Sequence, residues 1–406
     1  MKTPMPHVIL ISGRDPLEEI GGGHCAYVRA HARAALAAGF HPHLFCVSDR
    51  ARDVETDFGT VHRMADRGLA HRQTMIRFHA PTLAQGMGEF TRDHPVDAIH
   101  GFGVWSYAGA LLKARLGPDS PRFIMSMYTV YAVECQAQLD ALGHYPWGRE
   151  RLRQRIEVAW VQRMAAPCEH RAVLAADVVG VNYDSVQALI KQHHGSQVPI
   201  RKVHYGPESV FLPPFPTRAP EGEAWLGREG PLYLTITLQR PKKGTDILIE
   251  AMARLAHRGQ PGKLCIVGGG PMMGQHRKLA HALGIGDRVL FTGFVEDVRP
   301  WLNLADIYVQ PSLREESGAL AMLEAMQLGK PVVCSAIDGL REDIADGITG
   351  LLVPPMNSEA LAEAMIRMQD PDLRATIGQE AIRSFDRRFG AKVFARDIQT
   401  LYGQGS

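Results

Sequence analysis

Short apolar runs alternate with helix-length stretches of mixed polarity along this chain, and the alternation starts twice. Runs with the length of buried strands come first at 7–12, 43–47, 98–100, 123–127 and 177–182. After a proline-rich stretch they return at 232–238, 264–267, 289–291, 307–309 and 331–333. Strands that alternate with helices in this way form parallel sheets. We therefore predict an α/β protein with two doubly wound Rossmann-like domains and a cleft between their strand ends.

Length and composition agree with this prediction and exclude other classes. A chain of 406 residues exceeds one ordinary hydrophobic core. The net charge of only +2 indicates no general attraction to nucleic acid. The six cysteines form no C-x-x-C pair and no cluster typical of a metal site, so we expect reduced thiols. We find no secretory signal and no run of about 18 apolar residues, and we expect a cytoplasmic protein.

The stretch 307–333 carries the strongest local pattern. An apolar strand is broken at Pro311, and a polar loop leads into helix formers that begin at Gly318. Free N–H groups at the start of such a helix favour an anion such as phosphate. Glu316 lies just before this helix and Glu324 lies within it. The alternative is one more strand–helix–strand unit with two surface glutamates.

Two cations follow the first strand of the second half. Arg240 and Lys243 come directly after the strand at 232–238 and before a helix. Two cations beside a helix start suit a diphosphate group. A solvated Arg-Pro-Lys-Lys turn is the alternative.

The first half opens with a strand, a loop and a helix, and glycines stand where the loop becomes the helix. Gly22 and Gly23 are among them, and glycine at this place lets a ligand approach the backbone closely. Their order differs from the G-x-G-x-x-G fingerprint, which argues against a dinucleotide cofactor. His100 ends a later strand, where α/β sheets bind ligands, although a lone histidine there is more often structural.

Residues 134–176 form a long, helical and irregular segment. Within 145–160, tyrosine and tryptophan side chains flank a series of arginines. A basic stretch with aromatic residues can contact an anionic membrane surface or an acceptor phosphate. The alternative is a solvated helix whose apolar stripe is buried. Peripheral contact of 145–160 with the inner face of a membrane is therefore one of two interpretations.

Several motifs, in order along the chain, resemble those of the family 4 glycosyltransferases, which are retaining enzymes of the two-domain GT-B architecture. The motifs are Gly22-Gly23, Lys243-Gly244, the turns Ile266-Val267-Gly268-Gly269-Gly270-Pro271 and Phe291-Thr292-Gly293-Phe294-Val295, and Glu316-x7-Glu324 within a Pro-Ser-x-x-x-Glu stretch. Each motif is weak alone, but the ordered set is highly specific. The resemblance covers nearly the whole chain and is densest between residues 230 and 355.

The resemblance implies a hexosyltransferase that moves a sugar from a UDP- or GDP-sugar to a hydroxyl acceptor with retention. The acceptor would be a glycan, a lipid-linked sugar or a small molecule. The nucleotide sugar would be a co-substrate, with no separate cofactor and no metal ion. In this architecture the last helix returns to the first domain. We therefore expect an acceptor-binding domain of 1–207 plus 386–406 and a donor-binding domain of 208–385, the alternative being an ordinary terminal helix.

The resemblance also implies roles for single residues of the second domain. Glu324 would bind the ribose hydroxyls, because a carboxylate suits two adjacent O–H donors. Glu316 would orient the transferred sugar. Arg240 and Lys243 would neutralise the departing diphosphate. The remaining donor-binding positions would supply backbone N–H groups, close approach or a surface for the base; they are Gly22, Gly23, Gly270, Phe294, Gly318, Ala319 and Leu320.

The chain departs from the family pattern at two positions. The common Arg-x4-Lys spacing would place the arginine at Leu238, whereas Arg240 gives Arg-x2-Lys. The family usually has a histidine at the strand end where Tyr131 stands here. A tyrosine can hydrogen-bond a sugar hydroxyl but does not carry the same proton chemistry near neutral pH. We expect His100 and Tyr131 on the acceptor side.

Two other classes of function stay open. A nucleotide-sugar 2-epimerase shares the two-domain architecture but would convert the donor without an acceptor. A non-catalytic nucleotide-sugar-binding module would keep Glu324 and lose the cations, and Tyr131 and the altered arginine spacing favour it. A dehydrogenase is disfavoured by the missing G-x-G-x-x-G order.

Overall fold

The computed structural model describes residues 5–17, 22–49, 52–65, 73–142, 148–215, 229–315 and 317–403. The contacts between residues divide the chain into two compact units. Unit 1 comprises Met1–Leu139, Pro146–Leu212 and Phe389–Ser406, and unit 2 comprises Asp140–Tyr145 and Pro213–Arg388. The sequence predicted domain boundaries after residues 207 and 385. Of the predicted site residues, Glu316 lies outside the described residues.

Unit 1 is built on an eight-stranded sheet in the order β3-β4-β2-β1-β5-β6-β7-β8. All neighbouring strands are parallel except β3 and β4. The strands are β1 (His7–Gly13), β2 (His41–Ser48), β3 (Val54–Thr56), β4 (Gly59–Ala65), β5 (Val96–Phe102), β6 (Arg122–Ser126), β7 (Val178–Val181) and β8 (Ile200–Lys202). Strands β1, β2, β6 and β7 have no exposed position, because helices cover both faces of a parallel sheet.

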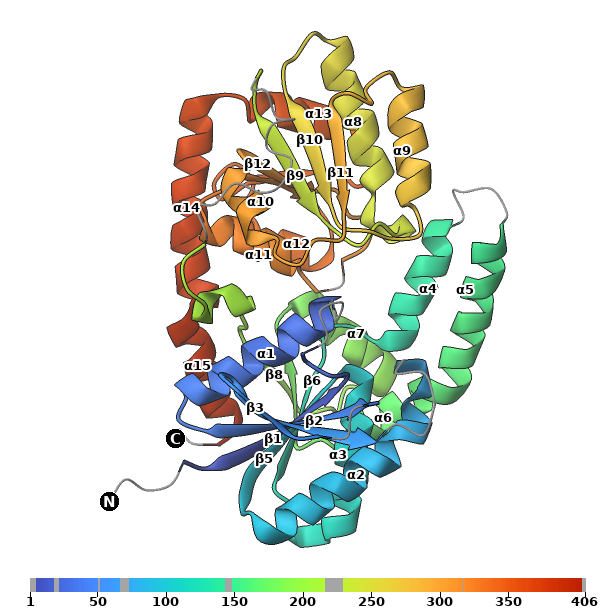
Figure 1. Ribbon diagram of the computed structural model, residues 1–406, viewed down its shortest axis with the longest axis vertical. Helices are drawn as coiled ribbons and strands as arrows, with labels where there is room; N and C mark the ends of the chain where they lie inside the picture. Colours follow the sequence, from blue (N-terminus) through green and yellow to red (C-terminus); the bar gives the residue numbers. More distant parts are fainter. Residues whose placement is uncertain are drawn as a thin grey trace. The chain divides into compact units, whose positions relative to one another are not determined.

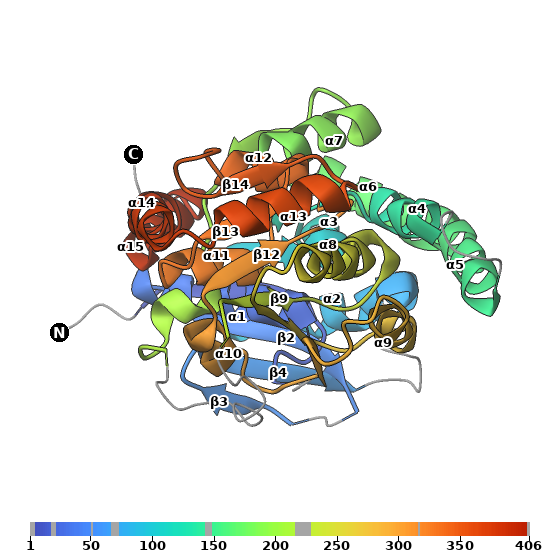
Figure 2. The same ribbon diagram turned by 90° about the horizontal axis from the view of Figure 1, so that it is seen from above.

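Helices cover the sheet of unit 1 on both faces (Figure 1). The helices of unit 1 are α1 (Gly22–Ala37), α2 (Ile76–Asp93), α3 (Tyr107–Leu116), α4 (Tyr131–Ala141), α5 (Arg149–Trp160), α6 (Ala166–Ala175), α7 (Asp184–His194) and α15 (Ala391–Leu401). Between α5 and α6 the chain forms one turn of π-helix, η5 (Val161–Ala165). The described part of the long segment predicted over 134–176 is therefore made of α4, α5, η5 and α6, and α4 and α5 run side by side (Figures 1 and 2).

Unit 2 is built on a six-stranded, all-parallel sheet in the order β11-β10-β9-β12-β13-β14. The strands are β9 (Leu232–Ile236), β10 (Lys263–Val267), β11 (Val289–Gly293), β12 (Ile307–Gln310), β13 (Val332–Ser335) and β14 (Leu351–Val353). The helices are α8 (Thr245–His257), α9 (Met273–Ala282), α10 (Arg299–Leu304), α11 (Leu320–Gln327), α12 (Asp338–Asp343), α13 (Ser358–Arg367) and α14 (Pro371–Phe389). The predicted class, two mainly parallel α/β sheets, is confirmed.

The last helix of the chain, α15, belongs to unit 1. Its apolar side chains Phe394, Ile398 and Leu401 are fully buried. The Tyr402 hydroxyl, one residue past α15, lies 3.0 Å from His100 Nδ1 in β5. The C-terminal segment is thus part of the core of the first domain.

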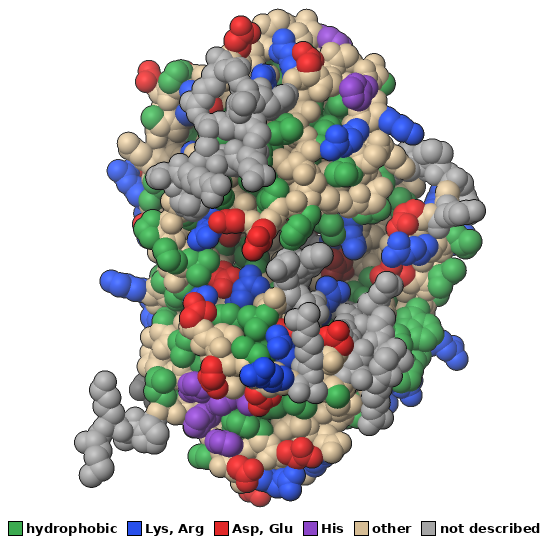
Figure 3. Space-filling view, viewed as in Figure 1, with side chains coloured by type: hydrophobic (Ala, Val, Ile, Leu, Met, Phe, Trp, Pro, Cys, Tyr) green, Lys and Arg blue, Asp and Glu red, His purple; other side chains and the backbone are tan. Residues whose placement is uncertain are grey.

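The surface carries both signs of charge. On the face seen in Figure 3, lysine and arginine are interspersed with aspartate and glutamate. In the part of the chain that the structure describes, no helix is long and apolar enough to cross a membrane. Within the same residues, no group of three or more His, Cys, Asp or Glu side chains could hold a metal ion. All six cysteines are buried and unbridged.

Candidate active site

Four loops of unit 2 meet at one edge of its sheet. They follow β9, β10, β11 and β12, and because these strands are parallel, their carboxyl ends lie along the same edge. The segments that connect them to the next helices hold the predicted donor-binding residues Gly270, Phe294, Gly318 and Ala319, and α11, which follows β12, holds Leu320 and Glu324. The topology therefore brings together motifs that are spread over about eighty positions of the sequence.

The loops after β9 and β12 are joined along their backbones. The Leu313 N–H donates to the Lys242 carbonyl over 2.8 Å. Gly244 has φ +62°, and a Cβ at this position would stand 2.1 Å from the Pro311 carbonyl oxygen. Only glycine fits both the left-handed conformation and the close approach. The Lys243-Gly244 motif thus fixes one loop against the other.

Lys243 is held by a neighbouring carboxylate, and that carboxylate is Glu315. The Lys243 Nζ lies 2.7 Å from Glu315 Oε1 and 2.6 Å from Oε2. The two side chains are 18% and 10% exposed, so the pair is largely removed from water. The Lys243 N–H also donates to the Arg240 carbonyl over 3.0 Å. Lys243 is therefore fixed at its backbone and at the end of its side chain.

A chain of buried hydrogen bonds leads into the Glu315 carboxylate. The Tyr308 hydroxyl donates to Gln310 Oε1 over 2.9 Å, and Gln310 Nε2 donates to Ser312 Oγ over 2.8 Å. The Ser312 hydroxyl then donates to Glu315 Oε2 over 2.8 Å. Burial raises the pKa of Tyr308, and the nearby Glu315 and Glu324 carboxylates raise that pKa further. Both carboxylates therefore lie near the same buried phenol, that of Tyr308 within β12.

The glycine turn after β10 is shaped by Gln239, a buried residue of the neighbouring loop. Gln239 Nε2 donates to the Gly268 carbonyl over 2.6 Å, and Gln239 Oε1 lies 2.8 Å from His276 Nδ1. Burial lowers the pKa of His276 to about 4, so its ring is neutral near pH 7. Gly270 has φ +150°, and a Cβ there would lie 2.5 Å from the Gln239 carbonyl oxygen. The turn that the resemblance identified is thus preformed.

The other predicted residues of unit 2 lie at or near this edge. Arg240 is exposed, and Phe294 presents 55% of its surface to solvent. Glu324 is half-buried within α11. That helix begins at Leu320, two residues later than predicted, and its first hydrogen bonds run from Met322 and Leu323 to the Ala319 carbonyl. The N–H groups of the first turn precede those bonds and are the ones that can face an anion.

The predicted residues of unit 1 have different surroundings. Gly22 and Gly23 are the first two residues of α1, and no atom lies within 4 Å of a Cβ added at Gly23. His100 is fully buried, with Nε2 2.7 Å from Ser126 Oγ and Nδ1 3.0 Å from the Tyr402 hydroxyl. Both ring nitrogens are thus engaged, which favours the structural interpretation that the sequence left open.

The sequence predicted that Tyr131 ends a strand, and this prediction is wrong. Strand β6 ends at Ser126, and Tyr131 is the first residue of α4. Its N–H lies 3.2 Å from each carboxylate oxygen of Glu169, a residue with 1% exposure. This carboxylate satisfies a free N–H group of the first helical turn. Burial, followed by the charges of neighbouring groups, raises the pKa of the Tyr131 hydroxyl, so it stays protonated near neutral pH.

Sequence reasoning missed Glu315. It stands next to Glu316, and only Glu316 satisfies the Glu-x7-Glu spacing, so the neighbour was counted as part of a polar loop. The available signal was the pair of adjacent glutamates after Pro311-Ser312, but no spacing rule links Glu315 to a lysine 72 positions earlier.

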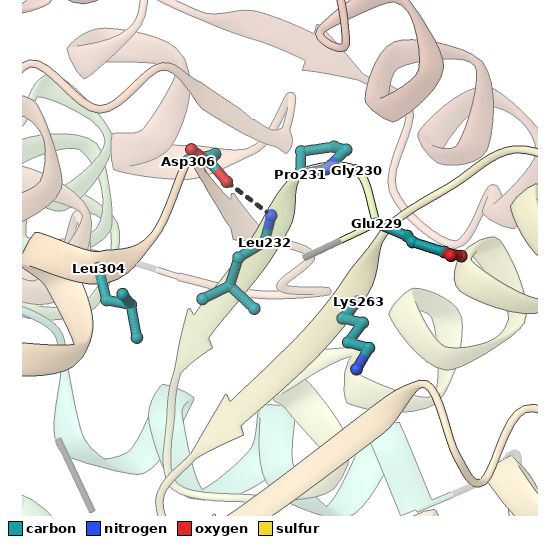
Figure 4. Close-up of a pocket in the computed structure, with 7 residues that line it drawn as sticks. All are labelled: Glu229, Gly230, Pro231, Leu232, Lys263, Leu304 and Asp306. Carbon is teal, nitrogen blue, oxygen red and sulfur yellow. Dashed lines mark hydrogen bonds between the residues drawn. The ribbon is translucent and has the colours of Figure 1, made fainter. Parts of the chain in front are cut away.

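A small pocket lies at the opposite end of this sheet (Figure 4). It is lined by residues that precede or begin β9 and β10, including Gly230, Pro231 and Lys263, and by Asp306. The Asp306 carboxylate accepts a hydrogen bond from the Leu232 N–H over 2.8 Å. This end carries none of the predicted donor-binding residues.

Comparisons with known proteins agree with the motifs. Residues 227–384 match the family described as glycosyl transferases group 1. Alpha-D-kanosaminyltransferase of Streptomyces kanamyceticus is 36% identical over 154 residues, which are 37% of this chain and 40% of the relative. D-inositol 3-phosphate glycosyltransferase of Xylanimonas cellulosilytica is 30% identical over 254 residues, 59% of each chain. The chain thus matches less than two thirds of the length of these relatives.

Among solved structures, sucrose-phosphate synthase from Thermosynechococcus elongatus resembles the whole chain. The TM-score is 0.75 at 22% sequence identity, and the likeness covers 98% of each chain. At this identity the likeness concerns the fold, the two-domain GT-B arrangement of two parallel α/β sheets. The match over residues 227–384, together with the ordered motifs, shows that this part of the chain, which lies within unit 2, belongs to the glycosyl transferases group 1 family.

Proposed function

We propose that this protein is a retaining glycosyltransferase that moves a sugar from a nucleotide diphosphate sugar to a hydroxyl acceptor. The observation that carries the proposal is the fixed position of Lys243 at the carboxyl edge of the second sheet, where the loop after β12 leads into α11. A cation near free N–H groups of a helix start suits a diphosphate. Such a site can stabilise charge that develops on a departing phosphate.

The donor would lie along this edge. Glu324 on α11 would accept hydrogen bonds from the ribose hydroxyls, and the exposed ring of Phe294 would support the base. Backbone N–H groups at Ala319 and Leu320 would hold the phosphates. The glycine turn at Gly270 leaves its backbone open to close approach. Glu316 keeps the role of orienting the transferred sugar, on the strength of the family resemblance.

The chemistry requires one bond to break and one to form. The bond between C1 of the sugar and the β-phosphate oxygen breaks, and negative charge develops on that oxygen. Lys243 and Arg240 would neutralise this charge. The acceptor hydroxyl forms the new bond to C1 on the same face, and its proton passes to the departing phosphate oxygen. Attack on that face retains the anomeric configuration.

The donor base would be uracil or guanine, and the acceptor a polyol or sugar hydroxyl on a glycan, a glycolipid or a small molecule. The names of the two relatives support this class, because one transfers kanosamine and the other glycosylates inositol 3-phosphate. In unit 1, Gly23 is the position where backbone could close over the donor phosphates, since a ligand would meet no side chain there. We propose no acceptor contact for the buried His100.

Release of nucleoside diphosphate tests this proposal. Purified protein is incubated with UDP-, GDP- and ADP-sugars, with and without polyol and sugar acceptors. We expect release with one donor class only when an acceptor is present, and a thermal stabilisation by the same donor, since it binds the folded state. Conversion of the donor without an acceptor would indicate the 2-epimerase. Stabilisation by a donor without any turnover would indicate the non-catalytic module.

Membrane contact belongs to this proposal through the outer face of α5. Leu152, Ile156 and Trp160 recur every four residues and are 57%, 62% and 41% exposed. Gln154 and Val158 are buried on the other side of the helix. Arg153 and Arg163 are exposed beside the apolar stripe. An exposed apolar stripe beside arginines suits the interface of an anionic bilayer, so we propose a cytoplasmic protein that docks on the inner face of a membrane.

Vesicle sedimentation tests the contact. We expect binding to vesicles that contain an anionic phospholipid, and loss of binding at high salt or with phosphatidylcholine alone. The Leu152→Ser, Ile156→Ser double variant should lose binding and keep turnover of a soluble acceptor. Leu174→Ser, which changes an exposed leucine on α6, is the matched control. Equal sedimentation of all three proteins would contradict the contact.

A further inference from the structure

Glu315 has no place in the Glu-x7-Glu spacing, yet it is the carboxylate that contacts Lys243. Both of its oxygens lie within hydrogen-bond distance of the Lys243 Nζ. We propose that Glu315 is a positioning residue, which holds the Lys243 ammonium group where the diphosphate of the donor departs. This inference rests on the proposed function, because it assigns a purpose to the contact only if Lys243 acts on a diphosphate.

The position of the Glu315 carboxylate is fixed from several sides. The Ser312 hydroxyl donates to its Oε2, and Ser312 is itself held by Gln310. Both of these residues are at most 1% exposed. The chain of donors runs from Tyr308 toward the carboxylate, so every member points its hydrogen in the same direction. The carboxylate therefore has little freedom to move with the Lys243 side chain. It holds the ammonium group of Lys243 in place.

The backbone of Glu315 is fixed as well. Its N–H donates to Asp338 Oδ2 over 3.0 Å. Asp338 has φ +39°, a conformation that is costly for a residue with a Cβ. A strained residue of this kind persists only where its surroundings hold it. The start of α12 is thus locked to the loop that carries Glu315.

Stability alone is a poor reason for this arrangement. A largely buried ion pair must overcome the cost of removing two charges from water, and well-packed apolar residues often serve stability equally well. The pair lies on the loops that carry the donor motifs, within a network that extends from β12 to α12. Its location favours a purpose in binding or chemistry.

Two effects on the donor follow from the geometry. Lysine has a long flexible stem, and a fixed partner keeps its charge at one place, which lowers the barrier of a reaction that needs charge at that place. The negative charge of Glu315 also opposes the dianionic donor in the ground state. Glu315→Gln should therefore reduce turnover while leaving donor affinity equal or improved. A residue that merely kept the loop folded would weaken both together.

The experiment compares Glu315→Gln, Lys243→Ala, the double variant and the control Glu363→Gln, an exposed glutamate on α13. Steady-state kinetics are measured with the preferred donor at a saturating acceptor concentration. We expect kcat to fall by about 10- to 100-fold in Glu315→Gln, with the KM for the donor unchanged or lower. The double variant should lose little more than Lys243→Ala, because the two residues act as one unit. Glu363→Gln should match the wild type.

The failures are distinguishable. If the wild type is active and Glu315→Gln keeps its kcat within about threefold, a difference below 1 kcal/mol, the inference is wrong and the proposed function stands. A raised donor KM with a proportionate loss of thermal stability would also overturn it, since that is the signature of a structural residue. If the folded wild type turns over no donor, the proposed function fails and takes the inference with it.

Discussion

Two places in the molecule bury polar groups in opposite ways. At the carboxyl edge of unit 2, Lys243 and Glu315 form an ion pair within 2.7 Å. In unit 1, an aromatic cluster that includes residues of α1 holds histidine and tyrosine side chains without charge. Its members are the buried residues Tyr27, His31, His100, Tyr205 and Tyr402 and the half-buried Tyr128. Burial lowers the pKa of His31 to about 3 and the pKa of His100 well below its ordinary value, so both rings are neutral.

The difference separates a site from a core. In the aromatic cluster the ring centroids of Tyr27 and Tyr128 are 3.8 Å apart, and those of Tyr27 and Tyr205 are 4.3 Å apart. Such contacts stabilise a fold and need no charge. Unit 2 instead keeps a cation that is costly to bury, at an edge where exposed Arg240 and Phe294 accompany it. Unit 1 also holds a buried ion pair, Arg63–Asp15 at 2.8 Å. It is therefore the location of the Lys243–Glu315 pair, on the loops that carry the donor motifs, that indicates function.

The largest effects should come from residues that contact the donor. Lys243→Ala should lower kcat by about 100- to 1,000-fold, because the variant loses a cation that stabilises negative charge in the transition state. Glu324→Ala should instead raise the donor KM by about 10- to 100-fold, because hydrogen bonds to the ribose are lost in ground and transition state alike. Steady-state kinetics and calorimetric titration with nucleoside diphosphate separate the two. Identical profiles for both variants would contradict the assignment of separate roles.

Two glycines sharpen the comparison between the units. Gly244→Ala should destabilise unit 2 by about 2–4 kcal/mol, because the position has φ +62° and the new Cβ would meet a carbonyl oxygen at 2.1 Å. Gly23→Ala in unit 1 should raise stability by up to about 1 kcal/mol, since it improves helix propensity in open space.

Activity then distinguishes the reasons for the two glycines. If the backbone at Gly23 closes on donor phosphates, Gly23→Ala should lose activity by about tenfold while its melting temperature stays or rises. Thermal unfolding and kinetics on the same preparations provide the check. Full activity in a stabilised Gly23→Ala variant would remove this residue from the donor site.

The pH dependence of stability should differ between a core that excludes charge and a site that keeps it. The folded protein resists protonation of His31 down to about pH 3, whereas the unfolded chain takes up this proton near pH 6.5. Stability contributed by His31 is therefore complete above pH 6.5 and is lost as the pH falls toward 3. At pH 5 the loss is about 2 kcal/mol for this one residue.

His31→Phe tests that dependence, because a phenyl ring can replace the imidazole between Phe102 and Phe394, whose centroids are each 4.9 Å away. The variant gives up a hydrogen bond of 2.8 Å to the Tyr27 carbonyl but should lose less stability between pH 7 and pH 5 than the wild type. His193→Gln, an exposed histidine of α7, serves as control. Parallel curves for His31→Phe and wild type in thermal unfolding would show that another group is responsible.

Most strands of the two sheets could be predicted, because buried strands are apolar runs separated by turn residues. The predicted strands at 7–12 and 264–267 correspond to β1 and β10 within one residue at each end. The short strands β3 and β8 were missed because each has a single apolar residue and every position is half-exposed or exposed, so they lack the signal of a buried run.

The site was less predictable because contacts between distant residues decide it. The Glu-x7-Glu spacing directed attention to Glu316, whereas the bond to Lys243 comes from Glu315 and depends on how the loops after β9 and β12 join. The sequence predicted His100 at a strand end, a position typical of a ligand-binding residue, but β5 continues to Phe102. The Tyr402 hydroxyl, 302 positions away in the sequence, lies within hydrogen-bond distance of His100 Nδ1, and no local sequence pattern predicts this contact.

The smallest expected effect concerns Phe294, and it tests whether unit 2 offers a surface for the base. The ring is 55% exposed, so Phe294→Ala should leave thermal stability unchanged. Stacking of a base on an aromatic ring is worth about 1–3 kcal/mol, and for an exposed ring we expect the lower limit, a rise of about fivefold in donor KM. Phe294→Tyr should restore the KM, because it keeps the ring. Leu238→Ala changes an equally exposed apolar side chain on the neighbouring loop, 50% exposed, and should have no effect. Equal KM values for Phe294→Ala and Leu238→Ala would place the base elsewhere and leave the edge of unit 2 with a phosphate site alone.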